Sequence, residues 1–234
     1  MYDASFDAGG ARPWLWAIRI VAVLAVILAS SALGQMPGAP VLQNAWATPG
    51  MVGALDIAGG SGGSVYAAAV SWTPGAGRFE VSGGVGYGTQ TGARSSGVYG
   101  ARVAVPFGGA SSAIGFAAFA GIGGGGGSRL TSGPQLDSLS STTEVPIGAA
   151  IGWRHAIGAA HGLSVFATPA YVFRSGGNGG NKGLARVGIG ADFGITNALG
   201  VTVGGDLGQT RPRGFGGPSG ALFGVGASYA FGRR

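Results

Sequence analysis

The chain has 234 residues, no cysteine and a formal net charge of +6, yet only 9% of its residues are charged and 52 are glycine. A soluble globular domain carries roughly 25% charged residues, so the composition excludes an ordinary water-facing surface. Only one stretch is apolar enough for a membrane helix, which excludes a helical bundle. Apolar residues spread evenly along a chain are typical of a lipid-facing β-barrel, and branched and aromatic residues recur too regularly for a disordered chain.

Residues 1–34 are predicted to be a signal peptide. Two arginines precede an apolar run at residues 20–29. Ala32 and Gly34 then fit the small-x-small rule for cleavage before Gln35. The alternative is an uncleaved anchor helix, but the run is short for the ~30 Å of hydrocarbon that a helix must span. Residues 35–50, which contain three prolines and little alternation, are predicted to be a periplasmic lead-in.

A single barrel domain is predicted over residues 51–234, because ten runs there alternate large apolar side chains with small or charged ones. This period of two places the two sets on opposite faces of a strand. The clearest run, 143–157, sets Val145, Ile147 and Trp153 against Glu144, Gly148 and Arg154. The ten runs are 51–58, 64–73, 78–89, 98–107, 113–123, 143–157, 163–174, 184–196, 199–210 and 221–231.

Connections between the runs alternate in length. Short ones (74–76, 108–112, 158–162, 197–198) alternate with longer ones, which include 124–142, 175–183 and 211–220. Outer-membrane barrels have short periplasmic turns and longer outside loops in this order. The fold class predicted is therefore all-β, a transmembrane antiparallel up-and-down barrel of about ten strands. Eight strands are the alternative, which requires both 51–58 and 64–73 to lie outside the barrel.

Aromatic residues fall near the two ends of the predicted strands, as expected for rings that settle at the membrane interfaces. The girdle near the periplasmic ends comprises Trp72, Phe79, Phe107, Trp153, Phe193, Tyr229 and Phe231. The girdle near the outer ends comprises Tyr66, Tyr87, Tyr99, Phe173 and Phe223.

Charged residues fall on the face opposite the large apolar set, where a lumen would place them. They are Asp56, Arg78, Glu80, Arg102, Glu144, Arg154, Arg186, Asp192 and Asp206. The tight turn at 197–198 makes Arg186 and Asp206 diagonal neighbours, about 7–8 Å apart at the backbone. We expect a salt bridge between them; the alternative is that lumen water hydrates each charge separately.

These features, together with the final Tyr229-Ala230-Phe231, resemble the superfamily of small outer-membrane β-barrel proteins. The resemblance implies a place in the cell outer membrane and contact with its lipid. It also implies that the barrel-assembly machinery recognises the terminal aromatic residue during insertion. Neither a cofactor nor a nucleic-acid partner is expected.

Catalysis is not expected either, because the only two histidines are poorly placed for it. His155 is predicted on the lipid side and His161 in a periplasmic turn, away from the outer rim where substrates arrive. A metal site is not expected, since the chain has no cysteine and the histidines are not flanked by carboxylates. The glycine-rich stretches 84–88 and 123–127 lack the helix and Lys-Ser/Thr pair of a phosphate-binding loop, so we assign them to closure of a narrow sheet.

The function expected is a non-enzymatic barrel, either structural or a very narrow pore, because ten strands lie close to the size that side chains fill. The alternative is an adhesin-like surface-binding barrel that acts through loops 124–142 and 211–220. Arg211 and Arg213, in the last outside loop, are candidates for contact with lipopolysaccharide phosphates, although a merely solvated loop is the alternative.

Overall fold

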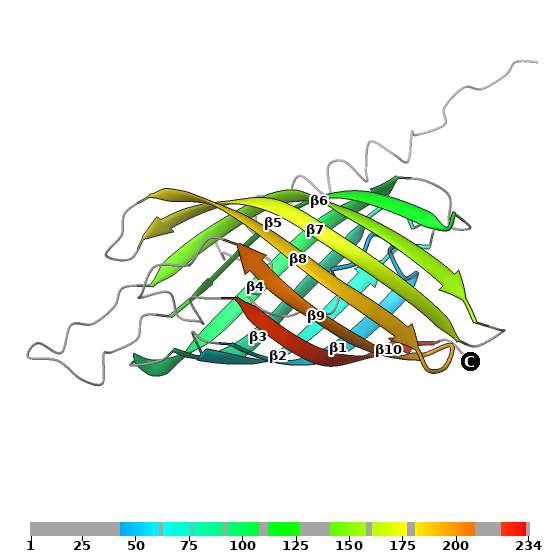
Figure 1. Cartoon of the computed structure of the whole chain (residues 1–234), viewed down its shortest axis with the longest axis horizontal. Coiled ribbons are helices and arrows are strands. Elements are labelled where there is room, and N and C mark those ends of the chain that lie inside the picture. Colours follow the sequence, from blue (N-terminus) through cyan, green and yellow to red (C-terminus); the bar gives the residue numbers. More distant parts are fainter. Residues whose placement is uncertain are drawn as a thin grey trace, which may run out of the picture. The chain divides into compact units, whose positions relative to one another are not determined.

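Alternating large and small side chains produce ten β-strands in the computed structural model of the chain (Figure 1). The structure describes residues 43–60, 63–75, 77–90, 93–107, 112–126, 141–157, 161–176, 181–208 and 221–232. Within these ranges there is no helix, and hence none long and apolar enough to cross a membrane. The strands are β1 (Gly50–Gly60), β2 (Gly63–Thr73), β3 (Glu80–Gln90), β4 (Ala93–Phe107), β5 (Ile114–Gly125), β6 (Thr142–Ala156), β7 (Gly162–Gly176), β8 (Lys182–Gly194), β9 (Leu199–Gly208) and β10 (Leu222–Phe231).

The sheet closes on itself. Every strand pairs antiparallel with its neighbours in sequence, and β1 pairs with β10 from Met51 opposite Phe231 to Gly59 opposite Phe223. Closure leaves no unpaired strand edge. The prediction of ten strands is confirmed, and the eight-strand alternative is wrong because β1 and β2 are paired along their whole length.

Two short turns set the register at one end of the barrel. In the β2–β3 turn, the Gly77 amide donates to the Pro74 carbonyl at 2.8 Å, and Gly77 adopts a φ of 65°. This turn delays the start of β3 to Glu80, so Arg78 is an exposed residue before the strand rather than the strand residue we expected. In the β8–β9 turn, the Ile195 amide donates to the Leu199 carbonyl at 2.9 Å, and the predicted pairing of Arg186 with Gly208 is confirmed.

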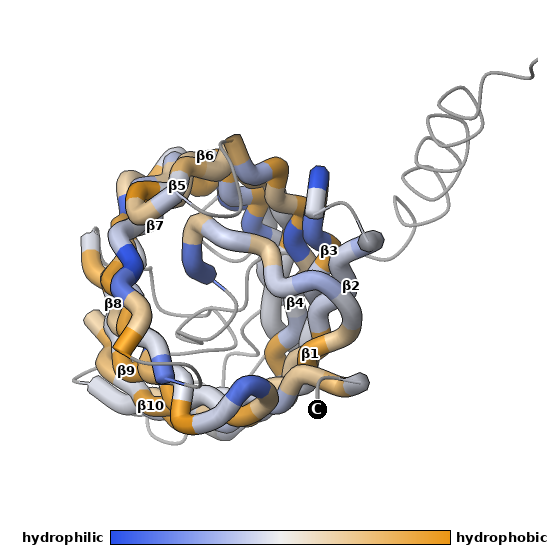
Figure 2. The backbone as a smooth tube through the Cα atoms, turned by 90° about the vertical axis from the view of Figure 1, so that its right-hand side faces the viewer, coloured by the Kyte–Doolittle hydropathy of each residue, from blue (hydrophilic) through white to orange (hydrophobic). Residues whose placement is uncertain are grey.

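Burial alternates along the strands, which separates an inner face from an outer one. Large apolar side chains such as Leu55, Ile57 and Val103 are exposed on the outside, whereas their sequence neighbours are buried in the lumen. Figure 2 looks along the barrel and shows the strands as a ring. Residues 43–49, which precede β1, lie inside this ring, against the inner face.

Candidate functional site

The inner face of the barrel gathers the charged residues of the strands. Among the strand side chains that the structure describes, nine of the ten charged residues lie on this face, and the tenth, Lys182, is exposed at the start of β8. The nine are Asp56, Glu80, Glu144, Asp192 and Asp206, with Arg102, Arg154, Arg174 and Arg186. The sequence predicted nine charged residues in the lumen. Eight of them lie on the inner face, and the ninth, Arg78, lies in the β2–β3 turn.

Arg186 and Asp206 form a salt bridge across β8 and β9. Arg186 Nε lies 2.9 Å from Asp206 Oδ1, and a second Arg186 nitrogen donates to the Asp206 carbonyl oxygen at 3.3 Å. Their side chains are only 3% and 13% exposed. Gly208 lies opposite Arg186 and Gly188 lies opposite Asp206, so no bulky side chain separates the two charges. The diagonal pair predicted from the turn at 197–198 is confirmed.

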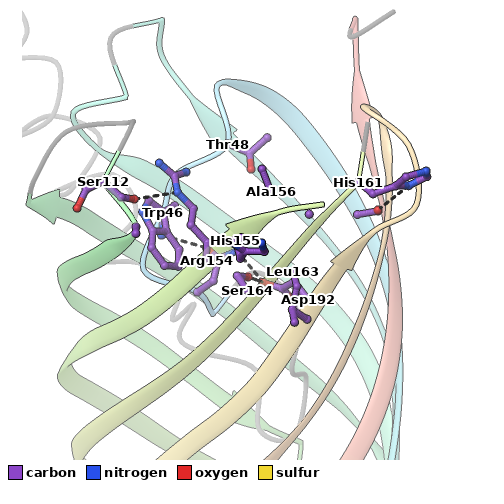
Figure 3. A pocket seen from close by; sticks show the side chains of 14 residues that line it. Trp46, Thr48, Ser112, Arg154, His155, Ala156, His161, Leu163, Ser164 and Asp192 are labelled. Carbon is purple, nitrogen blue, oxygen red and sulfur yellow. Dashed lines mark hydrogen bonds between the residues drawn. The ribbon is translucent and has the colours of Figure 1, made fainter. Parts of the chain in front are cut away.

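Asp192 is the centre of a second polar cluster, nearer the end of the barrel that carries the short turns. Its carboxylate accepts hydrogen bonds from Thr202 on β9 at 2.5 Å, from Asn44 at 3.0 Å and from Ser164 on β7 at 3.1 Å. Asn44 precedes β1 in the sequence, so this cluster joins the wall of the barrel to a segment inside it. Figure 3 shows Asp192 beside Ser164 at the base of a cavity of about 660 Å³.

The segment inside the barrel comprises residues 43–49, which we call the lumen segment. Ala45 is 1% exposed and packs against Ala117 and Ala150 of β5 and β6. The Thr168 hydroxyl donates to the Gln43 side-chain oxygen at 3.5 Å. The sequence predicted only a lead-in over residues 35–50 and gave no sign that residues 43–49 pack against the inner face of the barrel.

Trp46 is the largest side chain of the lumen segment. Its indole ring lies over two glycines, Gly115 of β5 and Gly152 of β6, which face each other in the register of these strands. A Cβ atom at either position would come within 2.5–2.6 Å of the ring. These glycines therefore make room for the tryptophan, a role that sequence reasoning missed when it assigned inward glycines only to closure of the sheet.

Arg154 also contacts the Trp46 ring. Its guanidinium carbon lies 5.0 Å from the ring centroid, and its Nε donates to the Ser112 carbonyl at 3.0 Å. Figure 3 shows these three residues together at the mouth of the cavity. A cation over an indole face is a favourable contact that strengthens when water is excluded.

Further inside, Glu80, Arg102 and Phe119 line the wall. The Glu80 carboxylate accepts a hydrogen bond from the Thr48 backbone amide and interacts with the charge of Arg102. The Arg102 guanidinium lies 4.3 Å from the centroid of the buried Phe119 ring. The lumen segment thus contacts charged residues at both of its ends.

Arg174 is a buried lumen residue that was not predicted from the sequence. It is 2% exposed and lies directly opposite Glu144 in the β6–β7 register. Arg174 is separated from the buried Val172 and Thr168 by an even number of residues, which puts all three on the same face of β7. The alternation in this strand could therefore have predicted that Arg174 faces the lumen.

The outer face of the barrel carries the aromatic residues that we expected in girdles. Ten of the twelve are exposed, and Phe79 and Tyr99 are half-buried. The register sets Met51 between Trp72 and Phe231 at one end of the strands and pairs Tyr66 with Tyr87 nearer the other end. Tyr171, which is 50% exposed and stacks edge-on against Phe173, extends the second band.

The two histidines lie near the turn end, where they also line the cavity. His155 projects from the outer face and stacks on Trp153, with ring centroids 5.8 Å apart. His161 stacks on Phe193, and its Nδ1 lies 3.4 Å from the Gly194 carbonyl oxygen. In the part of the chain that the structure describes, no three His, Asp and Glu side chains are grouped to hold a metal ion.

Several predicted features lie outside the described residues. They are the signal peptide at 1–34, Arg211 and Arg213, loop 211–220, and most of loop 124–142. The features that the structure does describe define a class of protein, a closed ten-stranded antiparallel β-barrel with a chain segment in its lumen. No protein-family model matches the sequence, and a comparison with curated proteins finds no significant match.

Proposed function

We propose that the chain is a non-enzymatic β-barrel of the cell outer membrane, either structural or forming a very narrow passage. The observation that carries this proposal is the inversion of an ordinary protein surface. Large apolar side chains cover the outside of the wall, and nine of the ten described strand charges lie inside. An exposed apolar surface of this extent needs a partner, and lipid is the partner that surrounds a barrel on all sides.

Energetics favour lipid as that partner. A charged side chain that faces mid-bilayer costs about 2–4 kcal/mol for arginine, so a membrane barrel keeps its charges in the lumen. The exposed aromatic residues near the strand ends match the interfaces of such a membrane. A water-soluble barrel would have the reverse arrangement, with its charges outside.

Several further parts of the proposal rest on the sequence. Residues 1–34 direct export and are removed, and the resemblance to small outer-membrane barrels favours insertion by the barrel-assembly machinery through the aromatic C-terminal strand. Outer-membrane lipid is then the partner of the outer face, and lipopolysaccharide phosphates are the partner proposed for Arg211 and Arg213. No nucleic acid and no cofactor enter the proposal.

The choice of a closed or narrow barrel is supported by the contents of the lumen. Eight-stranded barrels are just filled by side chains, whereas barrels of sixteen or more strands leave an open channel. Here the ten-stranded wall surrounds the lumen segment as well as the Arg186–Asp206 pair and Phe119. Little open cross-section is expected for solutes.

Three measurements on reconstituted protein test the proposal. The protein is expected to float with lipid vesicles, to resist extraction from them by alkaline carbonate, and to give small or no steady current in a planar bilayer. Release into the carbonate supernatant would contradict the membrane proposal, and porin-sized currents would contradict the narrow lumen.

A further inference from the structure

We propose that the lumen segment, residues 43–49, is a removable plug, and that its withdrawal opens a passage for small ions through the barrel. This inference rests on the proposed membrane barrel and adds a conducting state to it. Figure 2 shows residues 43–49 inside the ring of strands. The segment contacts β5, β6, β7 and β8 through side chains that project into the lumen.

The wall of the barrel does not need the plug for closure. β1 pairs with β10 over nine residue pairs and with β2 over eleven, and both ladders begin only after the plug ends. Gly50 lies at the junction with a φ of 94°, a left-handed conformation that favours glycine. This residue turns the chain from the lumen into the wall, so the plug can leave while the ladder hydrogen bonds stay intact.

The contacts that hold the plug are individually weak and reversible. Asn44 donates to Asp192 at 3.0 Å, Gln43 accepts from Thr168 at 3.5 Å, and the Trp46 ring is stacked under Arg154. Each of these contacts can be exchanged for contacts with water once the plug moves, whereas opening a strand ladder breaks many hydrogen bonds at once. The plug therefore has a lower free energy of release than the barrel has of unfolding.

The wall beneath Ala45 and Trp46 consists of glycine and alanine. Gly115, Gly152 and Gly188 would each clash with the plug if they carried a Cβ, and Ala117 and Ala150 contact Ala45. When the plug leaves, nothing bulky at these positions of β5 and β6 fills the space that Trp46 occupied. The gap that Trp46 leaves is then continuous with the cavity of about 660 Å³ that this residue lines.

Small ions of both signs are the solutes that fit this gap. The described strand charges that face the lumen comprise five acids and four bases. Because the two signs are nearly equal in number and Arg186 pairs with Asp206, no single sign dominates the passage. We infer weak selectivity between monovalent cations and anions.

The first test opens the plug by substitution. The Asn44→Ala/Trp46→Ala variant and a deletion of residues 43–49 are reconstituted into planar bilayers beside the full chain. Both are expected to give current steps several-fold larger than the full chain gives, with a reversal potential near zero in a gradient of KCl. The matched control is Trp72→Ala, which removes an exposed tryptophan from the outer face and is expected to leave the current unchanged.

The second test locks the plug in place. The chain has no cysteine, so Ala45→Cys/Ala150→Cys supplies a unique thiol pair within the buried alanine cluster. In the Asn44→Ala/Trp46→Ala background, a short bifunctional thiol reagent is expected to link the pair and abolish the added current. Each single-cysteine variant keeps the current after the same treatment.

Vesicle flotation separates failure of the plug from failure of the membrane proposal. If a variant floats with vesicles but its current equals that of the full chain, the plug proposal is overturned and the membrane barrel stands. Failure of the reagent to link Cys-substituted positions 45 and 150 in floated protein overturns it as well. If the deletion does not insert, the double substitution, which keeps the whole chain, decides the matter.

Discussion

Arg186 on β8 and Asp206 on β9 are joined by a 2.9 Å contact between Nε and Oδ1, with both side chains almost fully removed from solvent. A buried pair of this kind costs more to break than to replace, because removal of one partner leaves the other charge without its counter-ion. We expect Arg186→Ala and Asp206→Ala each to destabilise the barrel.

The double variant distinguishes a true pair from two separately hydrated charges. A coupling free energy of about 0.5–3 kcal/mol is expected for interacting residues. Urea unfolding of the two single variants and the double variant in lipid vesicles measures it. Strictly additive losses would show that the two charges do not interact.

Gly115 offers a test of the position of Trp46. The three atoms nearest to an added Cβ at this position all belong to the Trp46 ring, at 2.5–2.8 Å. We expect Gly115→Ala to cost about 1–3 kcal/mol through overpacking. In a Trp46→Ala background the same substitution should cost little, because the clashing ring is gone.

Gly97→Ala is the matched control, since nothing lies within 4 Å of an added Cβ there. Unfolding free energies of the four variants and the parent give the comparison. An equal cost of Gly115→Ala with and without Trp46 would contradict the position of the lumen segment against β5.

The outer face predicts a dependence on depth in the membrane. Val85 lies mid-strand in β3 and is 64% exposed, whereas Leu199 begins β9 at the turn end. Val85→Arg is expected to destabilise the folded barrel in vesicles by about 2–4 kcal/mol, and Leu199→Arg to destabilise it by about 0–1 kcal/mol. Similar costs at the two positions would argue against a bilayer around the wall.

The wall of the barrel was predictable because its signals are local. Alternation assigns each residue of β6 and β8 to a face without reference to the rest of the chain. The short turn after Thr196, whose hydroxyl accepts from the Leu199 amide at 2.9 Å, then fixes the register that joins Arg186 to Asp206. Residue pairs across such a turn can be predicted by counting outward from it along the two strands.

The lumen segment was not predictable because its signals are distant in sequence. Residues 43–49 have no period, and their place depends on Gly115, Gly152 and Asp192, which lie far along the chain. Inward glycines are expected in any narrow barrel, so they did not point to a tryptophan. Arg78 was misplaced for a related reason, since the turn at Gly77 takes up residues that alternation alone assigns to the strand.

Export gives a prediction on the maturation of the chain. Ala32 and Gly34 fit the cleavage rule, so the protein extracted from membranes should begin at Gln35. N-terminal sequencing or intact-mass measurement checks this. An intact Met1 in that material would contradict the signal-peptide prediction.

The fluorescence of three tryptophans tests the central claim most directly. A chain that begins at Gln35 contains Trp46, Trp72 and Trp153. Trp72 and Trp153 are exposed on the outer face, whereas Trp46 lies between Arg154 and the glycines of the inner wall. Variants that keep a single tryptophan, with phenylalanine at the other two positions, place one probe at each site.

Reconstitution of these variants into vesicles of brominated phospholipid gives the measurement. Bromine quenches an indole only on close contact, so lipid should strongly quench Trp72 and Trp153 and leave Trp46 bright. Absence of quenching at Trp72 and Trp153 in floated protein would contradict a lipid-facing outer wall. Strong quenching of Trp46 would contradict its place in the lumen.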